Sequence, residues 1–278
     1  MNNNKHALVL FTKYPEPGVT KTRLMEENGG ALTPEQAAEL YRAMVLDTAA
    51  VGVHALAECR KDHGSEEAFD LYISSSPESE IPKIREMFAT EFPGDGIKYI
   101  CDRGKNFDEH FNDSYQQLFA LGYDSVICVG GDLPCITPDL IVRSFGWLRQ
   151  QDKQSSTGAM VLAPCQAAGV SLVGVTRSAS MDFTGVFYNA EGCSALDALI
   201  TVARGKSIPT ALYEALFDVD YMEDLAHIMA VINATAYTCG FQPGIVVPER
   251  TLAMIGRLGL VTTTPPNTAH DPRGKIDG

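Results

Sequence analysis

The sequence lacks the features that mark membrane-embedded, exported or zinc-stabilised proteins. No apolar run in its 278 residues approaches the roughly 18 residues that a membrane span requires. None of the seven cysteines forms a C-x-x-C pair, and the six histidines form no H-x-x-x-H cluster, which argues against a structural zinc site. The apolar stretch near the N-terminus is too short for a signal-peptide core, and no small-residue cleavage site follows it. We therefore expect a cytoplasmic protein with reduced thiols and no membrane partner.

Positive charge is scarce over the chain as a whole. The formal net charge is −13, which argues against nucleic acid as a partner. Two phosphate-binding fingerprints are also absent, because neither G-x-x-x-x-G-K-[ST] nor G-x-G-x-x-G occurs after an apolar run. Residues 1–23 depart from this pattern, since they contain one acidic residue, Glu16, and four basic ones, Lys5, Lys13, Lys21 and Arg23.

Apolar runs alternate with helical periodicity along the chain. Runs at 7–11, 126–129, 159–163 and 170–175 predict buried strands. Thr33 and Asn106 are predicted helix caps, because Gln36 and Glu109 follow them at the capping-box spacing. No linker or internal repeat divides the chain, so we expect one layered α/β domain over residues 6–262. Residues 1–5 are expected to be flexible, and the polar, proline-rich tail 263–278 is expected to be disordered.

Asp132 follows the predicted strand 126–129 directly after Gly130-Gly131, and a proline-flanked helix start comes next. A carboxylate at the carboxyl end of a buried strand lies where open α/β sheets bind their ligands. It also suits a divalent cation that holds a phosphate. The alternative is that Asp132 only hydrogen-bonds the turn backbone.

Two further segments carry candidate residues. Lys13, Lys21 and Arg23 belong to the loop after the first strand, which contains Gly18 and two prolines and could hold a polyphosphate. The alternative is a solvated surface loop with ordinary basic residues. Asp218 and Asp220 precede a predicted helix, where one of them is either a second cation ligand or, in the case of Asp220, the helix cap.

These three segments together resemble the bacterial glycosyltransferase-like family often labelled selenodomain-associated transferase 1, among the nucleotide-diphospho-sugar transferases of GT-A fold. The family pattern F-A-K-x-P-x-P-G-x-x-K-T-R-L resembles residues 11–24, G-[ST]-D-x-P-x-[LI]-T-P resembles residues 130–138, and D-[VI]-D-T-x-E-D-L resembles residues 218–225. Order and spacing agree, and the resemblance spans roughly residues 6 to 230.

The resemblance implies a single-domain α/β/α sandwich with a mostly parallel mixed sheet. It implies that Lys13, Gly18, Lys21 and Arg23 contact the nucleotide phosphates. Asp132 would bind Mg²⁺ or Mn²⁺, with Asp220 or Asp218 as the second ligand. The partners would be a nucleotide or nucleotide-sugar and an acceptor that the sequence does not identify. Neither the oligomeric state nor the catalytic residue is predicted.

One stretch departs from the family pattern. The family carries D-G-G-Y-Y-L-I-G on a later strand, whereas residues 167–174 here lack the acid and both tyrosines. Two hypotheses follow. The first is a metal-dependent transferase that uses a nucleotide or nucleotide-diphospho-sugar, by glycosyl or nucleotidyl transfer. The second is a non-catalytic nucleotide-binding protein that kept the fold and lost the acceptor site.

Overall fold

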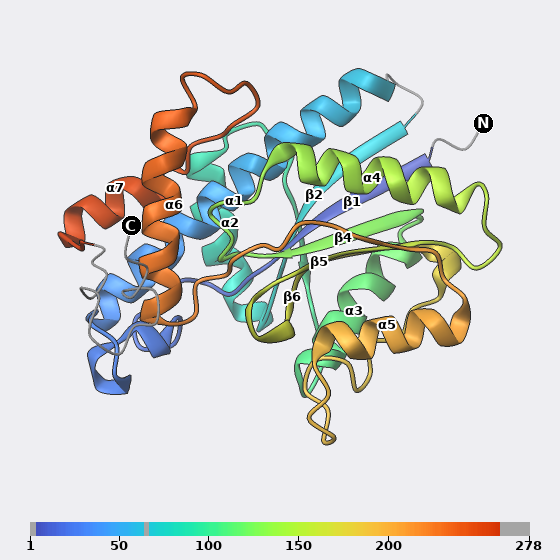
Figure 1. Cartoon of the computed structure of the whole chain (residues 1–278), viewed down its shortest axis with the longest axis horizontal. Coiled ribbons are helices and arrows are strands. Elements are labelled where there is room, and N and C mark those ends of the chain that lie inside the picture. Colours follow the sequence, from blue (N-terminus) through green and yellow to red (C-terminus); the bar gives the residue numbers. More distant parts are fainter. Residues whose placement is uncertain (1–3, 64–66, 262–278) are drawn as a thin grey trace, which may run out of the picture.

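The computed structural model describes residues 4–63 and 67–261, which form an α/β/α sandwich around a seven-stranded sheet (Figure 1). The strands are β1 (Asn4–Phe11), β2 (Glu67–Ser75), β3 (Lys98–Cys101), β4 (Ser125–Gly130), β5 (Met160–Pro164), β6 (Val170–Thr176) and β7 (Thr210–Leu212). Their order in the sheet is β3-β2-β1-β4-β6-β5-β7, and of these strands only β6 runs antiparallel to its neighbours. The predicted mostly parallel mixed sheet is confirmed.

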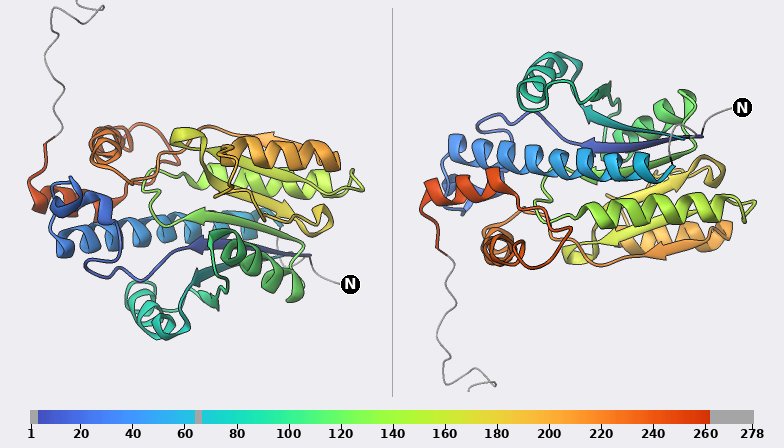
Figure 2. Two further views of the ribbon diagram at one scale, coloured as in Figure 1. Left: turned by 90° about the horizontal axis from the view of Figure 1, so that it is seen from below. Right: turned by 90° about the horizontal axis from the view of Figure 1, so that it is seen from above.

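Helices cover both faces of the sheet (Figure 2). They are α1 (Pro34–His63), α2 (Ile81–Glu91), α3 (Phe107–Ala120), α4 (Pro138–Asp152), α5 (Ala195–Lys206), α6 (Met222–Thr238) and α7 (Glu249–Leu258). Buried side chains of α1, α2, α4, α6 and α7 belong to the apolar cluster on one face, and those of α3 and α5 to the cluster on the other. Within the described ranges, no helix combines the length and apolar character needed to cross a membrane.

The central strands are apolar on both sides because both of their faces are covered. In β1, Leu8 and Leu10 belong to one cluster, whereas Ala7 and Val9 belong to the other. All four are at most 1% exposed. Since alternate side chains of a strand point to opposite faces, a continuous apolar run is what a doubly covered strand requires.

The predicted helix starts at Thr33 and Asn106 are confirmed. The Gln36 amide donates to Thr33 Oγ1 at 3.3 Å, and the Thr33 amide donates back to Gln36 Oε1 at 2.9 Å. This reciprocal pair is the capping box that the sequence predicts. The Glu109 amide donates to Asn106 Oδ1 at 2.9 Å, so Asn106 caps α3.

One predicted boundary is wrong. β1 begins at Asn4, and its first two residues pair with β2, so residues 4 and 5 belong to the sheet instead of to a flexible N-terminus. The backbone pairing of an added strand residue requires no apolar side chain, which is why the apolar run underestimates the strand. Residues 1–3, residue 262 and the predicted tail 263–278 lie outside the described residues.

Asp47, in the middle of α1, holds the start of α7. Its side chain is 3% exposed and accepts hydrogen bonds from the Thr251 amide and hydroxyl at 2.7 and 2.8 Å and from Arg250 Nη1 at 3.2 Å. We expect Asp47→Ala to lower the free energy of unfolding by about 3 kcal/mol, because buried donors lose their acceptor. Urea denaturation measures this. Asp139→Ala, which removes an exposed ion pair with Arg143, should cost less than about 1 kcal/mol; equal losses would contradict the role of Asp47.

Candidate functional site

Two strand ends approach closely at the carboxyl edge of the sheet. β1 and β4 pair in parallel with Phe11 opposite Gly130, so the loop after β1 and the turn after β4 start side by side. A Cβ atom on Gly131 would lie 2.8 Å from Thr12 Oγ1, and one on Gly130 would lie 2.7 Å from Asp132 Oδ1. The contacts of Gly131 are too short for a side chain, whereas a side chain on Gly130 would displace the Asp132 carboxylate. Gly131 therefore lets the Asp132 turn pack directly against the start of the basic loop.

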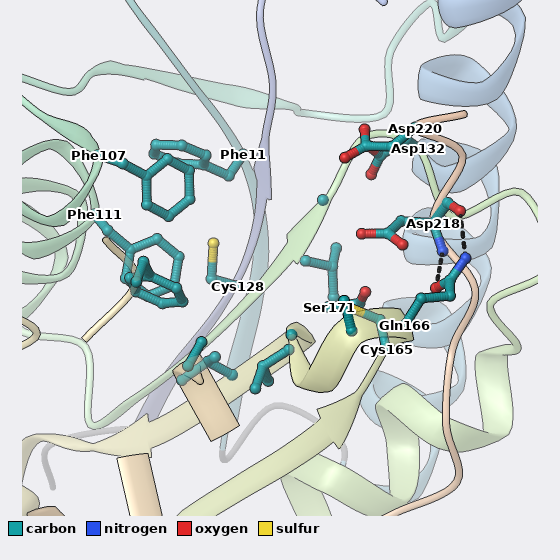
Figure 3. A pocket seen from close by; sticks show the side chains of 18 of the residues that line it. Phe11, Phe107, Phe111, Cys128, Asp132, Cys165, Gln166, Ser171, Asp218 and Asp220 are labelled. Carbon is teal, nitrogen blue, oxygen red and sulfur yellow. Dashed lines mark hydrogen bonds between the residues drawn. The ribbon is translucent and has the colours of Figure 1, made fainter. Parts of the chain in front are cut away.

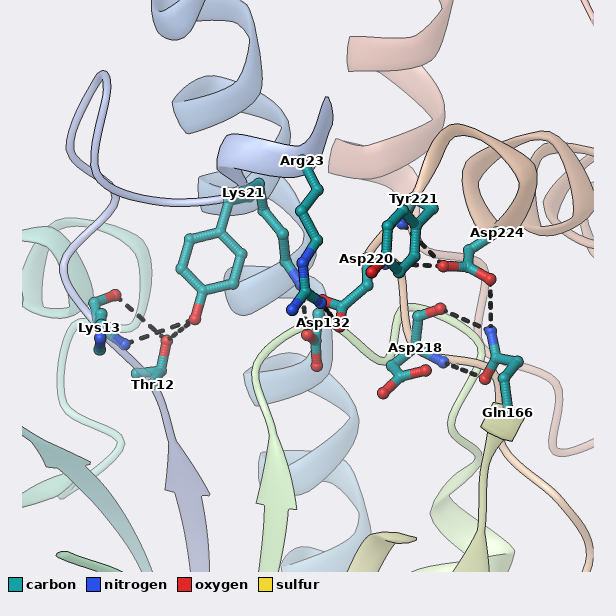
Figure 4. A network of polar contacts seen from close by, with 11 residues as sticks. Thr12, Lys13, Lys21, Arg23, Asp132, Gln166, Asp218, Asp220, Tyr221 and Asp224 are labelled. Carbon is teal, nitrogen blue, oxygen red and sulfur yellow. Dashed lines mark hydrogen bonds and ion pairs between the residues drawn. The ribbon is translucent and has the colours of Figure 1, made fainter. Parts of the chain in front are cut away.

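Lys21 connects this turn to a distant segment (Figure 4). Its Nζ atom lies 2.5 Å from Asp132 Oδ2 and 2.8 Å from Asp220 Oδ1, and Arg23 Nη1 lies 3.0 Å from Asp220 Oδ2. Burial alone would lower the pKa of Lys21, but the charges of Asp132 and Asp220 outweigh it and hold that pKa above its usual value. The pKa of Asp220 is lowered: burial opposes the shift, and the charges of Lys21 and Arg23 overcome it.

Tyr41, on α1, fixes the beginning of the basic loop. Its hydroxyl lies 2.8 Å from Thr12 Oγ1 and accepts a hydrogen bond from the Lys13 amide at 3.4 Å, and its ring centroid lies 5.6 Å from Lys21 Nζ. The sequence places Tyr41 in the apolar stripe of a helix, where it reads as a core residue. Its hydroxyl contacts come from a segment about thirty residues away, which helical spacing does not reveal.

A second network positions Asp218 and Asp220. Gln166 Nε2 donates to the Asp218 carbonyl at 2.9 Å and to Asp224 Oδ1 at 3.0 Å, while the Asp218 amide donates to Gln166 Oε1 at 3.3 Å. Asp224 Oδ2 accepts from the amides of Asp220 and Tyr221 at 3.1 and 2.8 Å. These contacts occupy the backbone of Asp218 and Asp220 and leave both carboxylates directed at the Lys21 side of the site (Figure 4).

A cavity of about 590 Å³ lies at this edge of the sheet. Asp132, Asp218 and Asp220 line one side of it, and aromatic side chains line the other (Figure 3). A neighbouring groove of about 280 Å³ is lined by Lys13, Lys21, Arg23 and other residues of the basic loop. Lys13, Tyr41 and Asp220 border both spaces, so the basic groove and the acidic end of the cavity adjoin.

The donor chemistry of the acidic end fits a hard divalent cation. Burial, followed by the negative charges of Asp132 and Asp220, raises the pKa of Asp218 to about 6, against the partial compensation of Lys21. Carboxylate oxygens with negative charge in excess are the ligands that Mg²⁺ and Mn²⁺ prefer. Across the described ranges, no three or more His, Cys, Asp or Glu side chains are grouped so as to enclose a metal ion. A cation here would take at most two carboxylates and complete its coordination with water or phosphate.

The structure brings together six of the seven predicted site residues. Asp132 binds Lys21 through its side chain, so its interpretation as a turn residue alone is not supported. Asp220 does not cap α6, because its carboxylate contacts Lys21 and Arg23. Gly18 lies outside the lining of both spaces. Its φ of 77° is one that glycine adopts without strain, which suits the turn around Glu16.

The turn that replaces the family's acid is strained. Ala167 and Ala168 have φ angles of 53° and 55°, in the left-handed region that non-glycine residues avoid. The turn connects β5 to β6 at the cavity, where Ala167, Ala168 and Gly169 all contribute to the lining. Glycine adopts this conformation without strain, whereas alanine pays a steric cost at both positions.

Comparisons with known proteins bear on the fold of the chain. The model of DUF2064, a family of uncharacterized proteins conserved in bacteria, matches residues 65–190, a little under half of the chain. No curated protein matches. A protein from Desulfovibrio desulfuricans G20, provisionally named a nucleotide-diphospho-sugar transferase, is similar over 91% of this chain and 97% of its own, with a TM-score of 0.66 and 22% identity.

More distant likenesses include a cytidylyltransferase from Leptospira borgpetersenii, with a TM-score of 0.48 and 10% identity over 92% of this chain and 95% of its own. Another is a CMP:2-keto-3-deoxy-manno-octonic acid synthetase complexed with CTP, with a TM-score of 0.44 and 11% identity over 83% of this chain and 99% of its own. The Desulfovibrio likeness confirms the predicted α/β fold of the nucleotide-diphospho-sugar transferases. With the family match, it confirms the resemblance that the three motifs indicate, at the level of fold.

Relief of backbone strain gives one prediction. We expect Ala168→Gly to raise the free energy of unfolding by about 0.5–1 kcal/mol, because the gain at a left-handed φ exceeds the extra entropy of glycine in the unfolded chain. Ala89→Gly, at an exposed position inside α2, should change it by about 1 kcal/mol in the opposite direction. Thermal and urea unfolding measure both; two losses of similar size would show that the turn stores no strain.

The raised pKa of Asp218 gives a second prediction. The folded protein keeps this proton up to about pH 6, whereas the unfolded chain releases it near pH 4. Stability should therefore fall as the pH rises from about 4 to 6, by about 1–2 kcal/mol for this partly solvated group. The pKa of Asp220 is lowered, so its effect on stability falls at a pH below about 4. In metal-free buffer, Asp218→Asn should remove the fall and Asp139→Asn should retain it; an unchanged profile in Asp218→Asn would refute the assignment.

Proposed function

We propose that the protein is a metal-dependent transferase that uses a nucleotide or nucleotide-diphospho-sugar. The observation that carries this proposal is the meeting of the basic groove with the acidic end of the cavity, where Lys13 and Asp220 border both spaces. Lysine and arginine side chains bind the phosphates of a nucleotide. Carboxylates bind the divalent metal ion that accompanies such phosphates. The cavity volume of about 590 Å³ is within the range of small-molecule sites.

The charges of the site explain why a metal is part of the proposal. A diphosphate that enters the cavity next to the basic groove approaches Asp132 and Asp218, whose carboxylates would repel it. Mg²⁺ or Mn²⁺ held by Asp132, with Asp220 or Asp218, would convert this repulsion into attraction. When bound, the metal supplies charge neutralisation for the diphosphate.

The protein's own residues divide the remaining work. Lys13 is exposed and has no ion-pair partner among residues 4–63 and 67–261, so it is available to a phosphate. Arg23 is 56% exposed and offers a second contact. Lys21 is the buried cation that holds Asp132 and Asp220 in place. Either glycosyl transfer, with departure of a nucleoside diphosphate, or nucleotidyl transfer, with departure of pyrophosphate, is compatible with this arrangement.

A non-catalytic nucleotide-binding protein is the second candidate. Two observations favour it: the Lys21 ammonium bridges the carboxylates that a metal would use, and no acid stands at Ala167 or Ala168. In favour of the transferase, the cavity continues from the carboxylates to an aromatic side, which leaves room for a second substrate. Release of a product distinguishes the two candidates.

Nucleotide binding tests the proposal directly. Nucleoside triphosphates and nucleotide-sugars should raise the melting temperature of the wild-type protein only when Mg²⁺ or Mn²⁺ is present. Asp132→Asn should abolish the metal-dependent part of this shift. Lys21→Met should weaken nucleotide binding by about tenfold or more, the usual value of a lost hydrogen bond to a charged group.

Lys98→Met is a matched control for Lys21→Met. Lys98 also pairs with an aspartate, Asp70 at 2.9 Å, and lies 5.6 Å from the ring centroid of Tyr72, but it is remote from the cavity lining. Its replacement should leave nucleotide binding unchanged. Absence of a shift with every nucleotide would refute both candidates. Metal-dependent binding without released nucleoside diphosphate or pyrophosphate would favour the binding protein.

A further inference from the structure

The side of the cavity opposite the carboxylates is an aromatic wall, formed by Phe11, Phe107, Phe111, Phe187 and Tyr188. The Phe107 ring centroid lies 5.5 Å from that of Phe11, 5.0 Å from that of Phe187 and 5.8 Å from that of Tyr188. Figure 3 shows Phe11, Phe107 and Phe111 grouped on one side and the acidic residues on the other, with Cys128 between them. The cavity thus has an aromatic, apolar end and an acidic end.

Polar side chains of α3 hold the loop of the aromatic wall in place. Asp108 is 7% exposed and accepts hydrogen bonds from the amides of Gly185 and Phe187 at 2.7 and 3.1 Å. Asn112 Oδ1 accepts from the Phe183 amide at 2.9 Å. These bonds tie the loop that carries Phe187 and Tyr188 to the helix that carries Phe107 and Phe111. The wall is therefore pre-organised, which reduces the entropy that a ligand would lose on binding.

Two rings of the wall are accessible from solvent. Phe107 is 37% exposed and Tyr188 is 79% exposed, although both line the cavity. Large exposed aromatic surface in a concave site is typical of ligand binding. Because aromatic rings prefer offset-stacked or edge-to-face partners, such a surface favours a flat ring over a saturated one.

The wall offers few partners to a nucleobase. Of the five rings only Tyr188 carries a hydrogen-bonding group; Phe11, Phe107, Phe111 and Phe187 have none, and Val173 adds another apolar contact. A base buried there would lose water from most of its polar edge with little replacement, which is unfavourable. An apolar aromatic ring has no such loss.

We propose that the aromatic wall binds the acceptor, and that the acceptor carries an apolar aromatic ring with a hydroxyl group. This inference rests on the proposed transferase function, which places the nucleotide phosphates at the acidic end. Ser171 lines the same cavity beside Cys165, with which its hydroxyl interacts. The hydroxyl of the ring would point from the aromatic wall toward the acidic end, where the proposed transfer would take place.

A matched pair of ligands tests the ring preference. 2-Naphthol and trans-2-decalol have the same bicyclic skeleton and hydroxyl group but differ in aromaticity. Titration calorimetry should show that the wild-type protein binds 2-naphthol at least about threefold more tightly. Phe107→Leu and Tyr188→Leu should each weaken 2-naphthol binding by about 3- to 10-fold and leave trans-2-decalol binding nearly unchanged. Tyr188 is largely exposed, so its variant should fold normally.

Tyr237→Leu is the control for an exposed aromatic residue, since Tyr237 is 73% exposed and lies outside the cavity. It should leave 2-naphthol binding unchanged, as should Lys21→Met. Absence of 2-naphthol binding, or equal affinity for the two ligands, would overturn the proposal while leaving metal-dependent nucleotide binding intact.

Nucleotide binding by the same variants shows whether the wall holds an acceptor or the nucleobase. Phe107→Leu and Tyr188→Leu should retain wild-type affinity for the nucleotide in the presence of metal, and saturating nucleotide should not displace 2-naphthol. If nucleotide affinity falls in these variants, the wall belongs to the nucleobase and the acceptor assignment is wrong. If 2-naphthol binds but no nucleotide does, the transferase proposal fails and the wall is not an acceptor site.

Discussion

The site depends on how closely two strand ends can approach. Phe11 and Gly130 stand opposite each other in the sheet, and the absence of a side chain at Gly131 lets the β4 turn contact Thr12. Only this approach places Asp132 within reach of a loop that begins at residue 12. A substitution that separates the two ends would remove the carboxylate from Lys21 without altering either residue. Gly131 thus has a positional role, because it determines where the Asp132 carboxylate lies.

Much of the fold follows from local patterns. The apolar runs of the central strands and the capping residues Thr33 and Asn106 specify where these elements lie, because strand burial and helix capping depend on nearby sequence. The meeting of Lys21 and Asp132 is also predictable, since loops at the carboxyl ends of neighbouring parallel strands share one edge. The strand start at Asn4 is the exception, because backbone pairing leaves no trace in hydropathy.

The rest of the site depends on contacts between segments that local patterns do not connect. Gln166 holds the Asp218 backbone across about fifty residues, and its amide has no distinctive neighbours in the sequence. Tyr41 and Phe107 both occupy apolar helix stripes, so their positions predict burial in the core. Phe187 comes from an irregular loop whose path is set by Asp108. Such residues acquire their roles only after the chain has folded.

The buried Lys21 ammonium also has a consequence for the order of events under the proposed function. A divalent cation that takes Asp132 or Asp220 removes an anion from a lysine that has little solvent to replace it. A phosphate oxygen supplies the missing anion, so each ligand makes the arrival of the other more favourable. Metal and nucleotide would then bind with positive coupling, each raising the affinity of the protein for the other by the same factor. Lys21 would be an internal placeholder, neutralising the carboxylates until both ligands are present.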